Sequence, residues 1–130
     1  MQNKSEQHLY EYAIVRYMPS MERGEFVNIG LLMMCKRRRW LRARVDCNMD
    51  RICAITHGTD TSGLEPQCEV FRSISEGRPK DHPIASLPAE ERFRWLTAVR
   101  SASIVTSRPH PGFTTDLDAT FERLYSALVL

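Results

Sequence analysis

The sequence lacks a long hydrophobic run and carries little net charge. Its longest apolar stretch, residues 26–35, is far too short to cross a bilayer as a helix. The first eight residues are polar and lack the apolar segment of a signal peptide, which favours a cytoplasmic location. With 18 Lys and Arg against 16 Asp and Glu, the net charge of +2 does not by itself indicate a nucleic-acid or membrane partner.

Signatures of catalysis and of metal binding are also absent. The chain contains no Gly-rich phosphate loop and no Gly-x-Ser-x-Gly elbow. Its four cysteines include no Cys-x-x-Cys pair, and Cys53 with His57 four residues later is the nearest approach to a zinc-ligand pattern. We therefore expect reduced thiols, no metal and no cofactor. These absences favour a non-enzymatic protein, although they leave open whether a reaction is catalysed.

The 130 residues are enough for one domain, 1–130, behind a flexible N-terminus at 1–8. Residues 10–17 are aromatic and β-branched, and residues 26–35 form a near-continuous apolar run, so both predict strands. Pro19 and Gly24 lie in the polar connector, which predicts a chain reversal. Residues 40–46 alternate apolar and polar side chains and predict a third strand. Three successive strands with short links favour an antiparallel meander.

The second half of the chain has mostly helical periodicity. A short helix is expected after Asn48 or Asp50, and a second ends at Gly77. Ser86 is expected to cap a third, and Thr115 or Asp116 a fourth with an apolar stripe. Residues 103–107 predict a short strand, whereas residues 108–112 are too rich in proline to pair in a sheet. The predicted class is α+β: an antiparallel sheet of three to four strands with helices packed on it, in the order βββααα(β)α.

Strand alternation predicts two different sheet faces. One face is apolar and is expected to lie under helices: Ala13, Val15, Val27, Ile29, Leu31, Met33, Leu41, Ala43 and Val45. The other carries aromatic residues and arginines: Tyr10, Tyr12, Ile14, Arg16, Phe26, Asn28, Gly30, Leu32, Met34, Trp40, Arg42 and Arg44. If open, this second face could stack bases and hold phosphates of a single-stranded nucleic acid. Alternatively, it is a second core layer with arginines at its rim.

Two further groups of polar residues are candidate binding sites. The first could bind an anionic or amide-bearing ligand, or form the site of a small enzyme, but is equally explained as a salt-bridged turn. Its members are Arg16, Glu22, Arg23, Glu25, Asn28 and Arg100. The second is the basic run 36–39, which could contact phosphates or form a solvated turn that discourages strand association.

Two stretches resemble a known family. Residues 10–17 with 22–30, read as YEYAIVRY and ERGEFVNIG, are similar to the opening of the bacterial domain of unknown function 3037. Residues 91–96 (ERFRWL), followed by Arg100 and Ser101, are similar to its second characteristic stretch. The resemblance implies a small bacterial protein without defined activity, and a HipA-like kinase as a possible partner. We therefore expect a binding or regulatory module that acts through a protein partner, with nucleic-acid binding and a small enzyme as alternatives.

Overall fold

A computed structural model describes residues 6–58, 60–98 and 103–130. The described elements are β1 (His8–Tyr17), β2 (Val27–Cys35), β3 (Trp40–Val45), α1 (Met49–Thr56), α2 (Leu64–Glu76), α3 (Ala89–Thr97), β4 (Ile104–Thr106), β5 (His110–Thr114) and α4 (Leu117–Leu128). The strands form an antiparallel sheet in the order β3-β2-β1-β4, and β5 also pairs with β1. The α+β class and the N-terminal meander are thus confirmed, and His8, expected in the flexible tail, is the first residue of β1.

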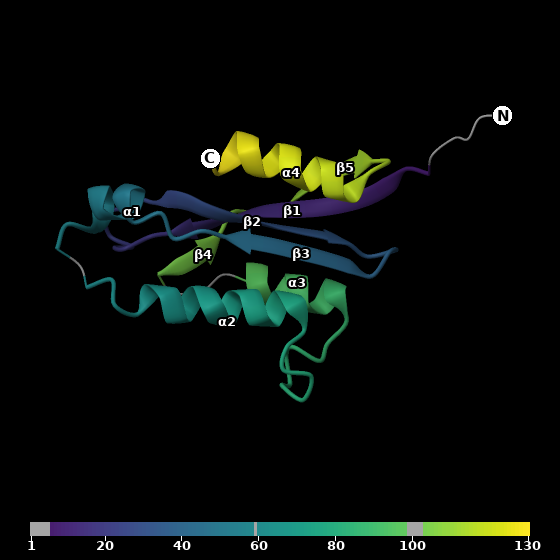
Figure 1. Cartoon of the computed structure of the whole chain (residues 1–130), viewed down its shortest axis with the longest axis horizontal. Coiled ribbons are helices and arrows are strands. Elements are labelled where there is room, and N and C mark those ends of the chain that lie inside the picture. The colour runs from purple at the N-terminus through teal and green to yellow at the C-terminus, as the bar shows by residue number, and fades with distance from the viewer. Residues whose placement is uncertain (1–5, 59, 99–102) are drawn as a thin grey trace.

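Helices cover both faces of the sheet. Figure 1 shows α4 on one side and α2 and α3 on the other. The α2/α3 side holds the larger core, which includes Val15, Phe71 and Phe93. The α4 side holds a second core, which includes Leu31 and Phe121. The amphipathic helices therefore bury their apolar stripes against a sheet that is apolar on both faces.

A bulge in β2 overturns part of the predicted face assignment. Val15 pairs with Gly30, but Arg16 pairs with Asn28, so Ile29 is an extra residue. One inserted residue reverses the alternation beyond it. Leu31 and Met33, which were expected on the same face as Ile29, therefore lie in the α4 core. Leu32 and Met34, which were expected on the opposite face from Ile29, pack with it in the α2/α3 core.

In β3, Leu41 faces the α2/α3 core, whereas the Arg42 guanidinium lies over Phe121 of α4. The predicted alternation of this strand is therefore confirmed. The third helix differs from the expectation in its first residue, because it follows Pro88 and has no side-chain cap. Ser86, the expected cap, instead donates its hydroxyl to the carbonyl oxygen of Pro83.

The strand β4 confirms the short strand expected at 103–107, but β5 contradicts the prediction that residues 108–112 do not pair. Proline is tolerated here because β5 pairs on one side only among the described strands. Pro111 lies opposite Glu11 and needs no N–H if that position points away from β1. At Gly112 a Cβ would lie 2.5 Å from the hydroxyl of Tyr10, so a larger residue there would displace the Tyr10 ring.

Candidate functional site

Two large apolar side chains are exposed at the end of the sheet where β1 begins. The β2–β3 turn, the start of β1 and β5 all lie at this end, on the right of Figure 1. Leu9 of β1 and Phe113 of β5 are direct cross-strand partners. Their exposed fractions are 55% and 67%, which is unusual for large apolar residues that face each other. They form a small apolar patch.

Basic residues border this patch. Glu11 pairs with Met34, so continuing the same register brings Leu9 opposite Lys36 at the start of the turn. Lys36 reaches Glu90 only at 3.4 Å, and Arg37, whose side chain is 79% exposed, reaches Glu6 only at 3.7 Å. Such solvated pairs neutralise the surface weakly. The sheet-end surface is defined by these residues: Leu9, Lys36, Arg37, Arg39 and Phe113.

A cavity of about 560 Å³ adjoins this surface at the start of α3. Its lining consists of Lys36, Arg39, Ser86, Pro88, Ala89, Glu90 and Arg92. Because Pro88 offers no side-chain acceptor, no side chain caps the first-turn amides of α3. Arg92 is committed to carbonyl oxygens of Leu87, Ile74 and Ser75. The cavity therefore brings Arg39 and Lys36, which contacts Glu90, to the N-terminal end of α3.

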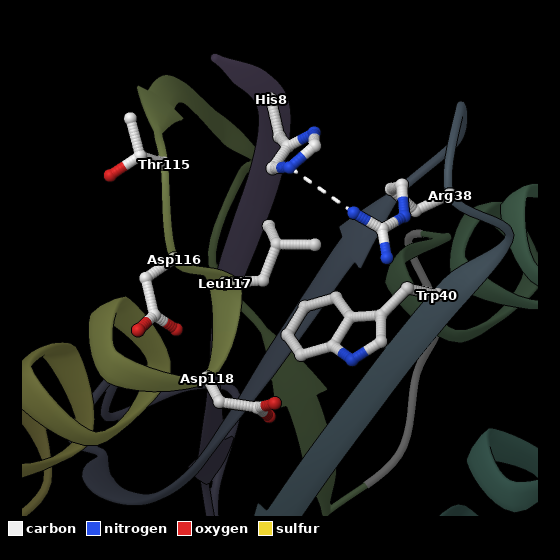
Figure 2. A pocket seen from close by; sticks show the side chains of 7 residues that line it. All are labelled: His8, Arg38, Trp40, Thr115, Asp116, Leu117 and Asp118. Atoms are coloured by element: carbon white, nitrogen blue, oxygen red, sulfur yellow. Dashed lines mark hydrogen bonds between the residues drawn. The ribbon is translucent and has the colours of Figure 1, made fainter. Parts of the chain in front are cut away.

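A second, smaller cavity of about 240 Å³ lies between the basic turn and the start of α4. Figure 2 shows the His8 ring facing Arg38, with Trp40 below them. His8 is only 7% exposed, and its Nε2 lies 3.2 Å from Arg38 Nη1. A guanidinium can only donate, so Nε2 must accept and the ring proton lies on Nδ1. His8 thereby fixes the guanidinium of Arg38 at the mouth of this cavity.

Carboxylates line the opposite wall of the smaller cavity. Asp116 uses one oxygen to cap α4 by accepting from the backbone N–H of Ala119, at 3.0 Å. Asp118 accepts from Arg42 at 2.9 Å. Both acids therefore already have structural partners. The cavity could hold a small group bearing both charges, but nothing about these side chains requires a ligand.

Arg42 and Arg44 do not form an open binding face, because both are half-buried against side chains of α4. Glu122 accepts from Arg42 at 2.6 Å and from Arg44 at 2.8 Å. Arg42 lies 4.2 Å from the ring centroid of Phe121. The two guanidinium groups lower the pKa of the Glu122 carboxyl, and its hydrogen bond raises the pKa of Arg44. These arginines fasten α4 to β3, as in the second-core-layer alternative.

Arg16, near the end of β1, is the cross-strand partner of Asn28, near the start of β2. The Arg16 guanidinium lies 4.2 Å from the centroid of Phe26, and burial lowers its pKa. Asn28 donates its amide to the carbonyl oxygen of Leu128 at 3.0 Å. Asn28 therefore links the start of β2 to the end of α4.

The other members of the polar group lie elsewhere. Glu25 accepts from Arg23 at 2.7 Å and bonds to His57 at 2.9 Å, and both contacts lower the pKa of the Glu25 carboxyl. Glu22 is exposed in the connector. Arg100 lies outside the described residues. Among the described residues, Glu25 forms no hydrogen bond or ion pair with Arg16 or Asn28, so the small-enzyme site expected around these three residues does not converge.

Metal ligands do not gather either. The described ranges hold no group of three or more His, Cys, Asp or Glu residues placed to bind a metal ion. Cys47 lies near Cys68, with a sulfur–sulfur distance of 2.9 Å, whereas Cys53 is exposed on α1. Within the same ranges, no helix is both long enough and apolar enough to span a membrane.

The sequence analysis did not identify the two apolar residues of the sheet-end surface, Leu9 and Phe113. Leu9 was outside the predicted first strand, and Phe113 followed a segment assigned to a loop. Extending the alternation of Tyr10 and Tyr12 backwards by two residues would have included His8 in the strand. No comparable sequence pattern predicts a strand at Phe113, because the segment contains both Pro111 and Gly112, which are rare in strands.

Comparison with known proteins identifies a family but no individual relative. No curated protein and no solved structure matches the chain. A family profile described as "Protein of unknown function (DUF3037)" matches residues 12–129, nearly the whole chain. The match begins in β1 and ends just after α4, so it includes all three layers described above. The chain therefore belongs to the DUF3037 family.

Proposed function

We propose that this protein is a non-enzymatic binding module whose sheet-end surface receives an acidic, extended segment of a partner protein. The observation that carries the proposal is the exposed apolar pair of Leu9 and Phe113 beside cationic residues. Apolar contacts supply affinity when a partner removes them from water, and the bordering charges select the partner and its orientation.

The electrostatics of the surface favour an acidic partner. Lys36 and Arg39 line the cavity that adjoins the apolar pair, and the uncapped start of α3 adds positive partial charge. Glu90 is the acidic residue of this lining, and it already contacts Lys36 and Arg94. A carboxylate from a partner could therefore enter the cavity without meeting an unpaired negative charge.

The strand edge favours an extended backbone. Pro111 cannot donate to β1, and Phe113, two residues later, has the same orientation along β5. The N–H and carbonyl of Phe113 then point away from β1, toward the side of β5 where the described chain has no further strand. An incoming strand can pair with these groups while its side chains contact Phe113, with Leu9 one strand further along the sheet.

This proposal retains the expected protein partner and relocates its binding surface. Part of the aromatic and arginine-bearing face considered for nucleic acids, including Tyr10, Trp40 and Arg42, packs against α4. The basic turn remains solvated at the sheet end. A HipA-like kinase, the partner implied by the family resemblance, is the first natural protein to test by co-purification.

The direct test measures binding to synthetic peptides that alternate Leu with Glu, Lys or Ser. We expect preference for the Glu series, and an affinity that falls as salt rises. Phe113→Ser and Lys36→Glu should each weaken binding at least about tenfold, as expected for an interface anchor. The matched controls are Val70→Ser on exposed α2 and Arg123→Glu on exposed α4, which should leave binding unchanged.

Equal affinity for the three peptide series would contradict the proposal. So would equal losses in the surface variants and their controls. If a single-stranded oligonucleotide binds instead, with Lys36→Glu but not Phe113→Ser reducing its affinity, the nucleic-acid alternative is favoured. Circular dichroism of each variant separates lost binding from lost folding.

A further inference from the structure

Two thiols from distant parts of the chain lie in direct contact. Cys47 follows β3 in the connector to α1, and Cys68 lies within α2. Their Sγ atoms are 2.9 Å apart, closer than non-bonded sulfur atoms normally pack. Both cysteines are free, so the site is a reduced dithiol whose sulfur atoms need little movement to bond.

The surrounding structure holds this pair together. Arg72 of α2 donates to the carbonyl oxygen of Val45 at the end of β3, at 2.8 Å. Arg72 also donates to Glu65 at 2.7 Å, one turn before Cys68. Cys68 is fully buried in the α2/α3 core, whereas Cys47 is partly exposed at its edge. A small oxidant can therefore reach Cys47 first, with Cys68 directly behind it.

We propose that Cys47 and Cys68 form an oxidation site at which hydrogen peroxide produces an intramolecular disulfide. The Cys47 sulfur attacks the peroxide, an S–O bond forms, the O–O bond breaks, and the leaving hydroxide takes the proton of the Cys47 thiol to become water. The Cys68 sulfur then attacks the Cys47 sulfenic acid. An S–S bond forms, the S–O bond breaks, and the leaving hydroxide takes the Cys68 proton to give a second water. Two electrons pass from the dithiol to the peroxide.

The other cysteines do not have this geometry. Cys53 is exposed on α1 and contacts neither member of the pair in the described structure. Cys35 is buried at the end of β2 in the core on the α4 side, across the sheet from Cys68. Peroxide should therefore yield one specific cross-link in the folded protein, between Cys47 and Cys68. The exposed Cys53 is the internal control, because a reaction that depended on exposure alone would also involve this thiol.

The cross-link would tie β3 to α2 and enclose α1 in a covalent loop. The two cysteines are 21 positions apart. Closing a loop of this size restricts the unfolded chain and should raise Tm by about 5–15 °C. Oxidation would thus strengthen the helical layer beneath the sheet, which is separate from the sheet-end surface of the proposed function.

The chemical environment makes the reaction slow near neutral pH. Burial raises the pKa of both Cys47 and Cys68, and the Glu65 carboxylate beside Cys47 acts in the same direction. The positive charge of Arg72 lowers the pKa of Cys68 but does not offset burial. Because thiolate is the reacting form, the cross-linking rate should increase about tenfold per pH unit between pH 7 and 8.5.

The test treats the reduced, folded chain with hydrogen peroxide, then unfolds it and alkylates the remaining thiols. We expect an intact mass showing loss of two hydrogens, and a peptide map joining Cys47 to Cys68. Cys53→Ser should retain the cross-link, and Cys47→Ser should abolish it. Cys68→Ala, checked by circular dichroism, should leave Cys47 as a sulfenic acid that a dimedone probe captures.

Three results would overturn the inference. The first is a folded protein, by circular dichroism, in which peroxide never joins Cys47 to Cys68. The second is a cross-link that forms only in urea, since the folded geometry would then play no part. The third is an equal yield of pairs that include Cys53, which would indicate random oxidation of exposed thiols.

Discussion

Replacing Gly30 by alanine tests the bulge that divides β2 between the two cores. A Cβ at Gly30 would lie 2.5 Å from the carbonyl oxygen of Arg44 and 3.0 Å from two atoms of Val45. The first of these is a backbone atom of the paired strand β3, which cannot rotate away as a side chain can. Gly30 is therefore required by the close approach of β3.

The expected cost follows from this contact. Forcing extra atoms into a well-packed site costs about 1–3 kcal/mol, because neighbouring groups must shift from their preferred positions. For a domain of this size, such a loss lowers Tm by about 4–12 °C. Since β3 must move, its hydrogen bonds to β2 should weaken first. Amide exchange should then accelerate along residues 40–45 before it does so in α4.

The measurement is urea unfolding followed by circular dichroism, with Gly63→Ala as the matched control. Gly63 precedes α2 with φ −88° and ψ 0°, and the nearest atom to its added Cβ is 3.7 Å away. That variant should change the free energy of unfolding by less than about 1 kcal/mol. If Gly30→Ala is as stable as Gly63→Ala, then β3 does not approach Gly30 closely and the reasoning fails.

Three other predictions concern the cores and their charges. In the reduced protein the raised pKa of Cys47 and Cys68 favours the neutral thiols in the folded state. The free energy of unfolding should therefore fall above about pH 8.5, by at most about 1.4 kcal/mol per pH unit for each thiol, and Cys68→Ala should flatten this slope in pH-dependent urea titrations. Phe121→Ala, which empties the centre of the α4 core, should cost about 3–5 kcal/mol by the same assay. Arg94 lowers the pKa of Glu11, so the stabilisation by this carboxylate is present above its unfolded-state pKa and is lost as pH falls through its lower folded-state pKa. Glu11→Gln should therefore cost up to about 1 kcal/mol at pH 7, and its difference from wild type should shrink as the solution is acidified.

Local patterns predicted most of the secondary structure. Aromatic and β-branched residues at 10–17 and strict alternation at 40–46 depend on immediate neighbours, and both strands are present. Asn48 and Asp116 act as helix caps, accepting from the amides of the first turn. These features are local because each depends on side-chain and backbone groups within a few residues.

The features that the sequence did not reveal depend on contacts between distant residues. The bulge at Ile29 requires a glycine next to it only because β3 approaches there. In β5, Gly112 pairs with Tyr10 and leaves room for its ring, a contact between residues far apart in the sequence. The alternation of apolar and polar residues contains no information about the neighbouring strand. It therefore predicts a regular strand around Ile29 and an unpaired segment at residues 108–112.

The same distinction explains why the basic segment at 36–44 divides into two parts with different roles. Arg42 and Arg44 are held by Glu122, which is about eighty residues away, and their charges are used inside the molecule. Arg37, in the turn, has only a long contact with Glu6 in solvent. In the sequence the six basic residues look equivalent, because the α4 carboxylates that hold Arg42 and Arg44 are about eighty residues away and are not visible locally. A partner that recognises charge should therefore meet the turn and not β3, so reversing Arg37 should affect binding, whereas reversing Arg44 should mainly destabilise α4.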